Sequence, residues 1–151
     1  MSCSAVAAAA FLWLAAADSS SMAPPAPPPA VLARSPLAQE PLFADIVGRA
    51  GRLKAEADAF KGAGTPVPEA FKQAVADLAA LDMKGHIVLK ERGTDGDLKC
   101  ILKGISEDLP LKLQALVSAT TPATRKAAAL DLAYLLNDNV EVITAPPAAP
   151  V

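Results

Sequence analysis

The sequence contains few of the residues that build strands or bind nucleic acid. Only 4% of its 151 residues are aromatic, while much of the 52% that is hydrophobic is alanine. Alanine favours helix, whereas aromatic and β-branched residues favour strands, so this composition predicts an all-α fold. Lys+Arg 14 nearly balance Asp+Glu 16, and no segment is strongly basic. Binding to nucleic acid needs a concentrated positive face, so that class of function is excluded.

Residues that carry metal, haem or phosphate chemistry are also scarce. The chain has 2 cysteines, Cys3 and Cys100, and 1 histidine, His86. The haem-attachment motif C-x-x-C-H and the phosphate-loop motif G-x-x-x-x-G-K-[ST] are both missing from the sequence. No pair of acidic residues stands out as an acid/base couple either. We therefore expect no cofactor and no enzymatic activity.

The N-terminal residues resemble an export signal. Residues 5–17, AVAAAAFLWLAAA, form an apolar run that is shorter than the roughly 20 residues a membrane-spanning helix needs. Small residues at Ala15–Ala17 suit a signal peptidase, so residues 1–17 are predicted to be a secretory signal peptide. No Lys or Arg precedes the run, which leaves an upstream start codon or an apolar helix of the folded domain as alternatives. After leader removal no membrane span is expected, and the protein is expected to be periplasmic or secreted.

Proline-rich segments flank the rest of the chain. Residues 18–40 begin with serines and contain Pro24, Pro25 and Pro27–Pro29, a composition typical of an extended spacer. Residues 146–151 are again rich in proline. The folded domain is therefore predicted to span residues 41–145.

Hydrophobic periodicity predicts four helices in that domain. Residues 41–61 carry an apolar residue every three or four positions, and residues 65–92 do the same after a capping Thr65–Pro66. A third helix is expected to begin at Asp95 or Asp97, and to kink or restart near Pro110 with Ser106 as a second cap. Thr121–Pro122 predicts the start of a fourth helix that ends near Thr144. The predicted stripes are Phe43, Ile46, Ala50, Leu53, Ala57 and Phe60; Val67, Phe71, Ala74, Leu78, Leu81, Gly85 and Val88; Leu98, Ile101, Leu102, Ile105, Leu109, Leu113, Leu116 and Val117; and Ala129, Leu132, Leu136, Val140 and Ile143.

One segment admits a second interpretation. Residues 86–91 and 98–103 could instead form two strands of a hairpin around Gly93–Gly96, and Ile87 and Val88 encourage this. The helical spacing crosses the segment without losing phase, so we favour helices. No helix can bury its apolar stripe unless it packs against another helix, and the links between the helices are short. The sequence therefore predicts a small antiparallel, up-down four-helix bundle.

His86 and Asp82 are the only candidate metal ligands. They lie four residues apart, so both side chains can meet on one turn of a helix, where a carboxylate could orient the imidazole ring. Met83 lies nearby, but it cannot oppose His86 across a haem from the same helix. The alternative is a structural histidine at the edge of the bundle that is hydrogen-bonded to Asp82. Metal sites normally gather several ligands, so this alternative is the stronger one.

Cys100 is the candidate reactive thiol. It would be the sole cysteine after leader removal, it lies nearly opposite the apolar stripe of its helix, and Lys99 and Lys103 are its neighbours. Positive neighbours and a helix N-terminus favour a thiolate, and an unpaired cysteine in an exported protein suggests an intermolecular disulfide. The alternative is a small residue packed against a neighbouring helix.

These observations lead to three hypotheses of function. The first is a non-catalytic exported bundle that binds an unknown protein or small ligand or serves the cell envelope, and its surface should include an apolar patch or groove. The second is a bundle that binds a metal or cofactor through His86 and Asp82. The third is a homodimer or redox-responsive protein linked through Cys100.

Overall fold

Helix α1 (Pro41–Ala59) shows most directly how the sequence pattern becomes structure. In the computed structural model, which describes residues 35–62, 64, 66–93 and 96–145, all six residues of the predicted stripe on this segment are buried. Pro41 lies in the first turn, where the N–H that it lacks would have no partner in the helix. The apolar face of α1 therefore points into the interior of the protein along its whole length.

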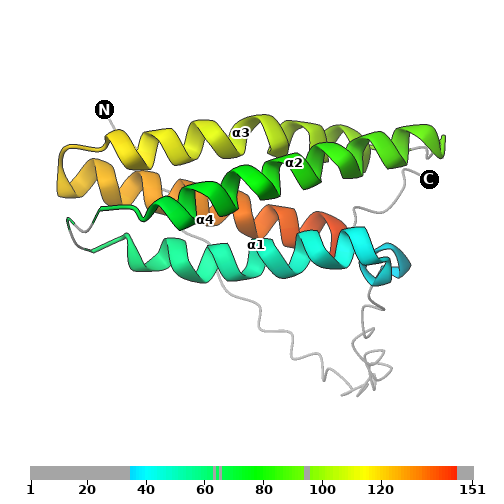
Figure 1. Cartoon of the computed structure of the whole chain (residues 1–151), viewed down its shortest axis with the longest axis horizontal. Helices are drawn as coiled ribbons and strands as arrows, with labels where there is room; N and C mark the ends of the chain where they lie inside the picture. Colours follow the sequence, from blue (N-terminus) through cyan, green and yellow to red (C-terminus); the bar gives the residue numbers. More distant parts are fainter. Residues whose placement is uncertain (1–34, 63, 65, 94–95, 146–151) are drawn as a thin grey trace, which may run out of the picture. The chain divides into compact units, whose positions relative to one another are not determined.

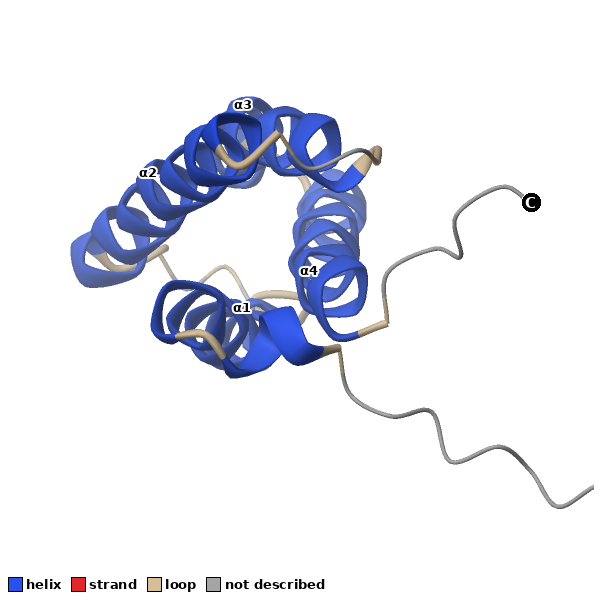
Figure 2. Ribbon diagram, turned by 90° about the vertical axis from the view of Figure 1, so that its right-hand side faces the viewer, coloured by secondary structure: helices blue, strands red, loops and turns tan. Residues whose placement is uncertain are grey.

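Three further helices follow, and they confirm the predicted all-α bundle. They are α2 (Glu69–Glu91), α3 (Leu98–Ser118) and α4 (Pro122–Thr144). Consecutive helices run in opposite directions and pack side by side, and α4 closes the ring against α1 (Figure 1). The end view in Figure 2 shows α2 and α4 on opposite sides of the interior. The four apolar stripes meet in one core.

The alternative of a hairpin at residues 86–103 is wrong. The described residues of this segment belong to the end of α2, to turn residues 92–93 and 96–97, and to the start of α3. Gly93 follows α2 with a φ of +65°, the left-handed conformation that ends helices and that glycine adopts without steric cost. The predicted end of this helix near Arg92–Gly93 is confirmed.

The start of α2 and its buried face differ from the prediction. Helix α2 begins at Glu69 rather than at Thr65–Pro66, and the extended Pro68 is its N-cap. A proline disfavours helical conformation in the residue before it, so Pro68 opposes a helix that would include Val67. The predicted core positions Ala74, Leu81 and Val88 are only partly buried. The next residue in each case, Val75, Asp82 and Leu89, is buried instead. The true stripe carries an acidic residue, which a purely apolar pattern does not select.

Helix α3 continues through Pro110 without a restart. Ser106 does not cap a second helix, because its hydroxyl donates to the carbonyl of Lys103 one turn earlier in the same helix at 2.7 Å. Leu109 and Leu116 are buried as expected, whereas Val117 is exposed. A proline in a helix removes one backbone hydrogen bond, and here the apolar contacts on both sides of Pro110 keep the helix intact.

Helix α4 begins at the predicted cap. The backbone N–H of Thr124 donates to Thr121 Oγ1 at 3.1 Å, and the N–H of Thr121 donates to Thr124 Oγ1 at 3.2 Å. This reciprocal pair satisfies two of the N–H groups that a helix start leaves without partners. Ala129, Leu132, Leu136 and Ile143 are buried, whereas Val140 is only partly buried.

Residues 35–40, expected in the spacer, contact the bundle instead. Pro36–Gln39 form a short 3-10 helix, and the backbone N–H of Ser35 donates to the carbonyl of Thr144 at 3.1 Å. Arg92 donates to both carboxylate oxygens of Glu40, which links the start of α1 to the end of α2. The predicted leader and tail, the rest of the spacer and the cap Thr65 lie outside the described residues. Among the described helices, none combines the length and the apolar character needed to cross a membrane.

Removing core volume from α3 should destabilise the bundle. Leu102 is fully buried, so Leu102→Ala is expected to lower the free energy of unfolding by about 2–5 kcal/mol through lost burial and a cavity. Leu111 lies on the same helix with 62% of its surface exposed, so Leu111→Ala should change that free energy by less than about 0.5 kcal/mol. Urea denaturation of the two variants checks this, and equal effects would contradict the burial described here.

Candidate functional site

Asp82 of α2 lies in the core of the bundle. The buried face of α2 follows Phe71, Val75, Leu78, Asp82 and Gly85, so the helical spacing that buries its neighbours also buries Asp82. Its side chain is 0% exposed, and it is the only Asp, Glu, Lys or Arg that is buried among the described residues. A buried carboxyl is costly unless it is hydrogen-bonded or neutral, so its environment needs explanation.

The partner of Asp82 comes from the helix diagonally opposite. Asn139 of α4 is also 0% exposed, and its Nδ2 donates to Asp82 Oδ2 at 2.8 Å. In the described structure α2 and α4 do not pack against each other, since each contacts α3 and α1 instead. The hydrogen bond therefore crosses the interior and joins two helices whose backbones do not contact each other.

This polar pair is only partly satisfied. Asp82 Oδ1 and Asn139 Oδ1 are both buried and have no hydrogen-bond partner. Burial raises the pKa of the Asp82 carboxyl to about 7, although the hydrogen bond from Asn139 acts in the opposite direction. The desolvation of the charged form is thus the larger effect.

A glycine keeps the surroundings of Asp82 closely packed. Gly85 lies one turn after Asp82, and a Cβ at that position would lie 3.2 Å from Leu102, 3.3 Å from Phe43 and 3.4 Å from Ile46. The absence of a side chain at Gly85 therefore lets α1 and α3 approach α2 beside the polar pair. Close apolar packing excludes water, which is why burial dominates the pKa of Asp82.

His86 does not join Asp82, although the two lie one turn apart. Its Nδ1 lies 2.6 Å from the carbonyl oxygen of Lys99, so a protonated Nδ1 donates to the first turn of α3. The imidazole ring is half-buried and holds the end of α2 against α3. Within the described ranges, no three His, Cys, Asp or Glu side chains are grouped as metal ligands. His86 and Asp82 thus have separate hydrogen-bond partners, and a metal site formed by the two stays a hypothesis.

Cys100 lies apart from both residues on the surface. It is exposed in the first turn of α3, on the side of the helix away from the apolar stripe. The three residues singled out from the sequence therefore face different environments: the core for Asp82, the α2–α3 contact for His86, and solvent for Cys100. They do not converge on one pocket.

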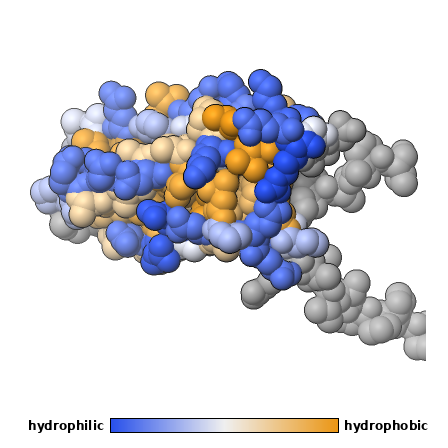
Figure 3. Space-filling model, turned by 45° about the vertical axis from the view of Figure 1, so that its right-hand side comes forward, coloured by the Kyte–Doolittle hydropathy of each residue, from blue (hydrophilic) through white to orange (hydrophobic). Residues whose placement is uncertain are grey.

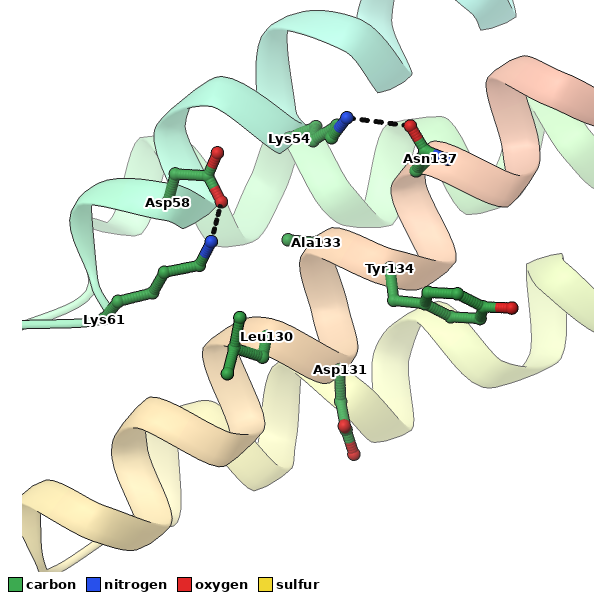
Figure 4. Close-up of a pocket in the computed structure, with 8 residues that line it drawn as sticks. All are labelled: Lys54, Asp58, Lys61, Leu130, Asp131, Ala133, Tyr134 and Asn137. Atoms are coloured by element: carbon green, nitrogen blue, oxygen red, sulfur yellow. Dashed lines mark hydrogen bonds and ion pairs between the residues drawn. The ribbon is translucent and has the colours of Figure 1, made fainter.

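An open depression between α1 and α4 was not anticipated from the sequence. The depression has a volume of about 530 Å³. Figure 4 shows the side chains that line it, which are Lys54, Asp58, Lys61, Leu130, Asp131, Ala133, Tyr134 and Asn137. Lys54 Nζ donates to Asn137 Oδ1 at 2.7 Å across the two helices, and Lys61 pairs with Asp58. The charged groups of the depression are thus of both signs, and the fourth, Asp131, pairs with Lys112 of α3.

Two large apolar side chains remain exposed beside this depression. Leu130 is 43% exposed and Tyr134 is 70% exposed, and they lie one turn apart on the outer face of α4. The sequence carries a signal for this pair, since two apolar residues lie four positions apart, but the predicted stripe of this helix covers only its inner face. Three other large apolar side chains are exposed in the described part of the chain: Ile87, Leu111 and Val117.

Apolar side chains also gather elsewhere on the surface. In Figure 3 they occupy the middle of one face and are bordered by hydrophilic residues. An apolar patch or groove is what the binding-module hypothesis expects, and binding itself stays a prediction. Comparison of the chain with protein-family models, with curated proteins and with solved structures found no match.

The contact of His86 with α3 should be measurable as stability. His86→Ala removes the hydrogen bond to the Lys99 carbonyl, so the free energy of unfolding is expected to fall by about 1 kcal/mol. Ile87→Ala, on the exposed next residue of α2, is the control and should have a smaller effect.

Thermal unfolding with and without Zn²⁺ tests the metal hypothesis. If Zn²⁺ stabilises the wild type and this stabilisation is lost in His86→Ala, the metal hypothesis is supported instead.

Proposed function

We propose that this chain is an exported, non-catalytic binding module that holds a protein partner at the depression between α1 and α4. The observation that carries the proposal is the exposure of Tyr134 and Leu130 one turn apart on α4. Keeping two large apolar side chains in water gives no stability to the fold, whereas burying them against a partner is favourable. The predicted leader at residues 1–17 supports export to the periplasm or the exterior.

The shape of the depression favours a protein over a small molecule. It is open, and small-molecule sites usually bury 70–90% of their ligand, roughly, in an enclosed cleft. Tyrosine is enriched in protein interfaces because its ring provides apolar contact area and its hydroxyl bonds at the rim. The depression is also lined by charges of both signs, from Lys54, Lys61, Asp58 and Asp131. A matching partner surface would offer an apolar side chain surrounded by polar groups.

The proposed role is non-catalytic because the reactive side chains do not converge on one site. Asp82 is enclosed in the core, the Nδ1 of His86 bonds to a backbone carbonyl, and Cys100 is exposed on another helix. General acid–base or nucleophilic catalysis needs such groups within hydrogen-bond reach of one substrate position. The depression itself is lined by lysines and aspartates that bond to neighbouring side chains.

Site-specific crosslinking followed by affinity measurement tests the proposal. A photoreactive residue replaces Tyr134 in the exported protein, and a matched chain carries it at Leu111, an exposed residue of α3. We expect position 134 to crosslink to one protein that position 111 does not reach. Tyr134→Ala should then weaken binding of that purified partner at least about tenfold, whereas Leu111→Ala should leave the Kd within about twofold.

Three results would count against this function. They are equal crosslinking from both positions, a Kd that Tyr134→Ala does not change, and crosslinking only to a second copy of the chain. The last result would show self-association at this surface in place of a distinct partner. Circular dichroism of Tyr134→Ala should match the wild type, because the side chain is 70% exposed and contributes little to the core.

A further inference from the structure

The hydrogen-bonding groups of the buried pair do not match if Asp82 is ionised. An ionised carboxylate offers only acceptors, whereas the carboxamide of Asn139 offers two N–H donors and one acceptor. One N–H already bonds to Asp82 Oδ2 at 2.8 Å. The oxygens that remain, Asp82 Oδ1 and Asn139 Oδ1, are both acceptors, and both are buried without a partner. Two orphaned acceptors in one core would be destabilising.

A single added proton corrects this mismatch. A carboxyl that carries its proton on Oδ1 becomes a donor on one oxygen and remains an acceptor on the other. A planar acid and a planar amide can then form two antiparallel hydrogen bonds, one from N–H to the carboxyl oxygen and one from O–H to the amide oxygen. Both orphaned oxygens gain a partner in this way, and no net charge stays in the apolar interior.

We propose that the folded bundle binds one proton at Asp82, and that this proton lies between Asp82 Oδ1 and Asn139 Oδ1, joining α2 to α4 across the core. The proton comes from solvent and adds to an ionised carboxylate, so no bond other than the new O–H is formed or broken. This inference does not depend on the proposed function, since it concerns the interior and not the surface of α4.

The groups around Asp82 are consistent with a neutral carboxyl. Beside Gly85, one turn along α2, the adjacent side chains from α1 and α3 are Phe43, Ile46 and Leu102. His86 is the titratable neighbour on α2 itself, and its Nδ1 bonds to the Lys99 carbonyl. No charged side chain contributes to the raised pKa of Asp82. The charged groups of the surrounding helices include the ion pairs Asp45–Arg49 on α1 and Lys103–Glu107 on α3, and Asp138 and Glu141 on α4.

Protonation of Asp82 in the folded state determines whether the free energy of unfolding rises or falls with pH. The carboxyl has a pKa near 3.8 in an unfolded chain and about 7 in the bundle. Between these values the native state binds more protons than the unfolded state, so the free energy of unfolding falls as the pH rises. The contribution of Asp82 is complete below about pH 4 and is lost by about pH 7. The bundle should therefore be more stable in mild acid than near neutrality, as far as this residue is concerned.

Direct titration of the wild-type chain is the first test. NMR of protein labelled with ¹³C in its aspartate carboxyl groups should show one resonance that titrates near neutral pH. Infrared spectra at pH 6 should show the carbonyl band of a protonated carboxyl. Both signals should be missing in Asp82→Asn. Carboxyl resonances that all titrate below about pH 5 would overturn the proposal.

A neutral isostere of Asp82 provides the second test. In Asp82→Asn an amide N–H takes the place of the O–H, so the two-bond pair is kept without a titrating proton. The free energy of unfolding of this variant should equal that of the wild type at acid pH and exceed it above pH 7. There the unfolding constant of the variant should be lower by up to about a thousandfold, because the two pKa values are 3.8 and about 7.

The control for this comparison is Asp77→Asn on the same helix. Asp77 is exposed and accepts a hydrogen bond from Gln73, so this variant should keep the pH profile of the wild type. An Asp82→Asn variant that keeps that profile as well, or that is less stable than the wild type at every pH, would refute the shared proton. Thermal unfolding from pH 4 to pH 8 gives the profiles for all three chains.

Discussion

Four amphipathic helices can remove their apolar stripes from water only by sharing one interior, and every other feature of the bundle depends on that constraint. Burial of apolar surface is the main favourable term in folding, and none of the stripes can be covered within its own helix. Short links make neighbouring helices antiparallel, and α4 then completes the ring against α1. Positions that face the interior are therefore fixed in number and place, and Asp82 occupies one of them.

The constraint explains what could be predicted from the sequence. The stripe of α1 and the start of α4 followed directly from spacing and cap chemistry, because in these segments each inward position carries an apolar residue and Thr121 provides a good cap. On α2 the same reasoning chose Leu81, since an apolar pattern never selects an aspartate. The true register depends on Asn139, far away in the sequence, which bonds to Asp82 only in the folded chain.

Other features depended on tertiary contacts that a single sequence does not reveal. A proline at position 110 predicts an interruption from local rules, yet the packing of Leu109 and Leu116 holds α3 together. The depression beside Tyr134 is formed by two helices that are distant in sequence. Its residues carry no recognisable motif, so only their exposure in the folded chain distinguishes them. Sequence reasoning thus predicted the core well and the surface poorly.

The interior contains polar side chains and the surface contains large apolar ones, although the opposite distribution is usual. Asp82 and Asn139 are polar groups in the core, and Tyr134 and Leu130 are apolar groups in water. The first departure costs stability in an isolated bundle and the second adds none, and local rules are most often broken where a protein has a further requirement. A pair of polar side chains in a core of leucines also distinguishes one register of the helices from others, because a shifted register would separate Asp82 from Asn139.

The contact between Ser35 and Thr144 has a consequence for protein engineering. A backbone hydrogen bond of 3.1 Å places the two ends of the folded region next to each other. Domains with adjacent ends tolerate new connections between them, including circular permutation and insertion into a loop of a host protein. The bundle could thus be displayed within another protein through two closely spaced attachment points, with its four helices intact and its outer faces accessible.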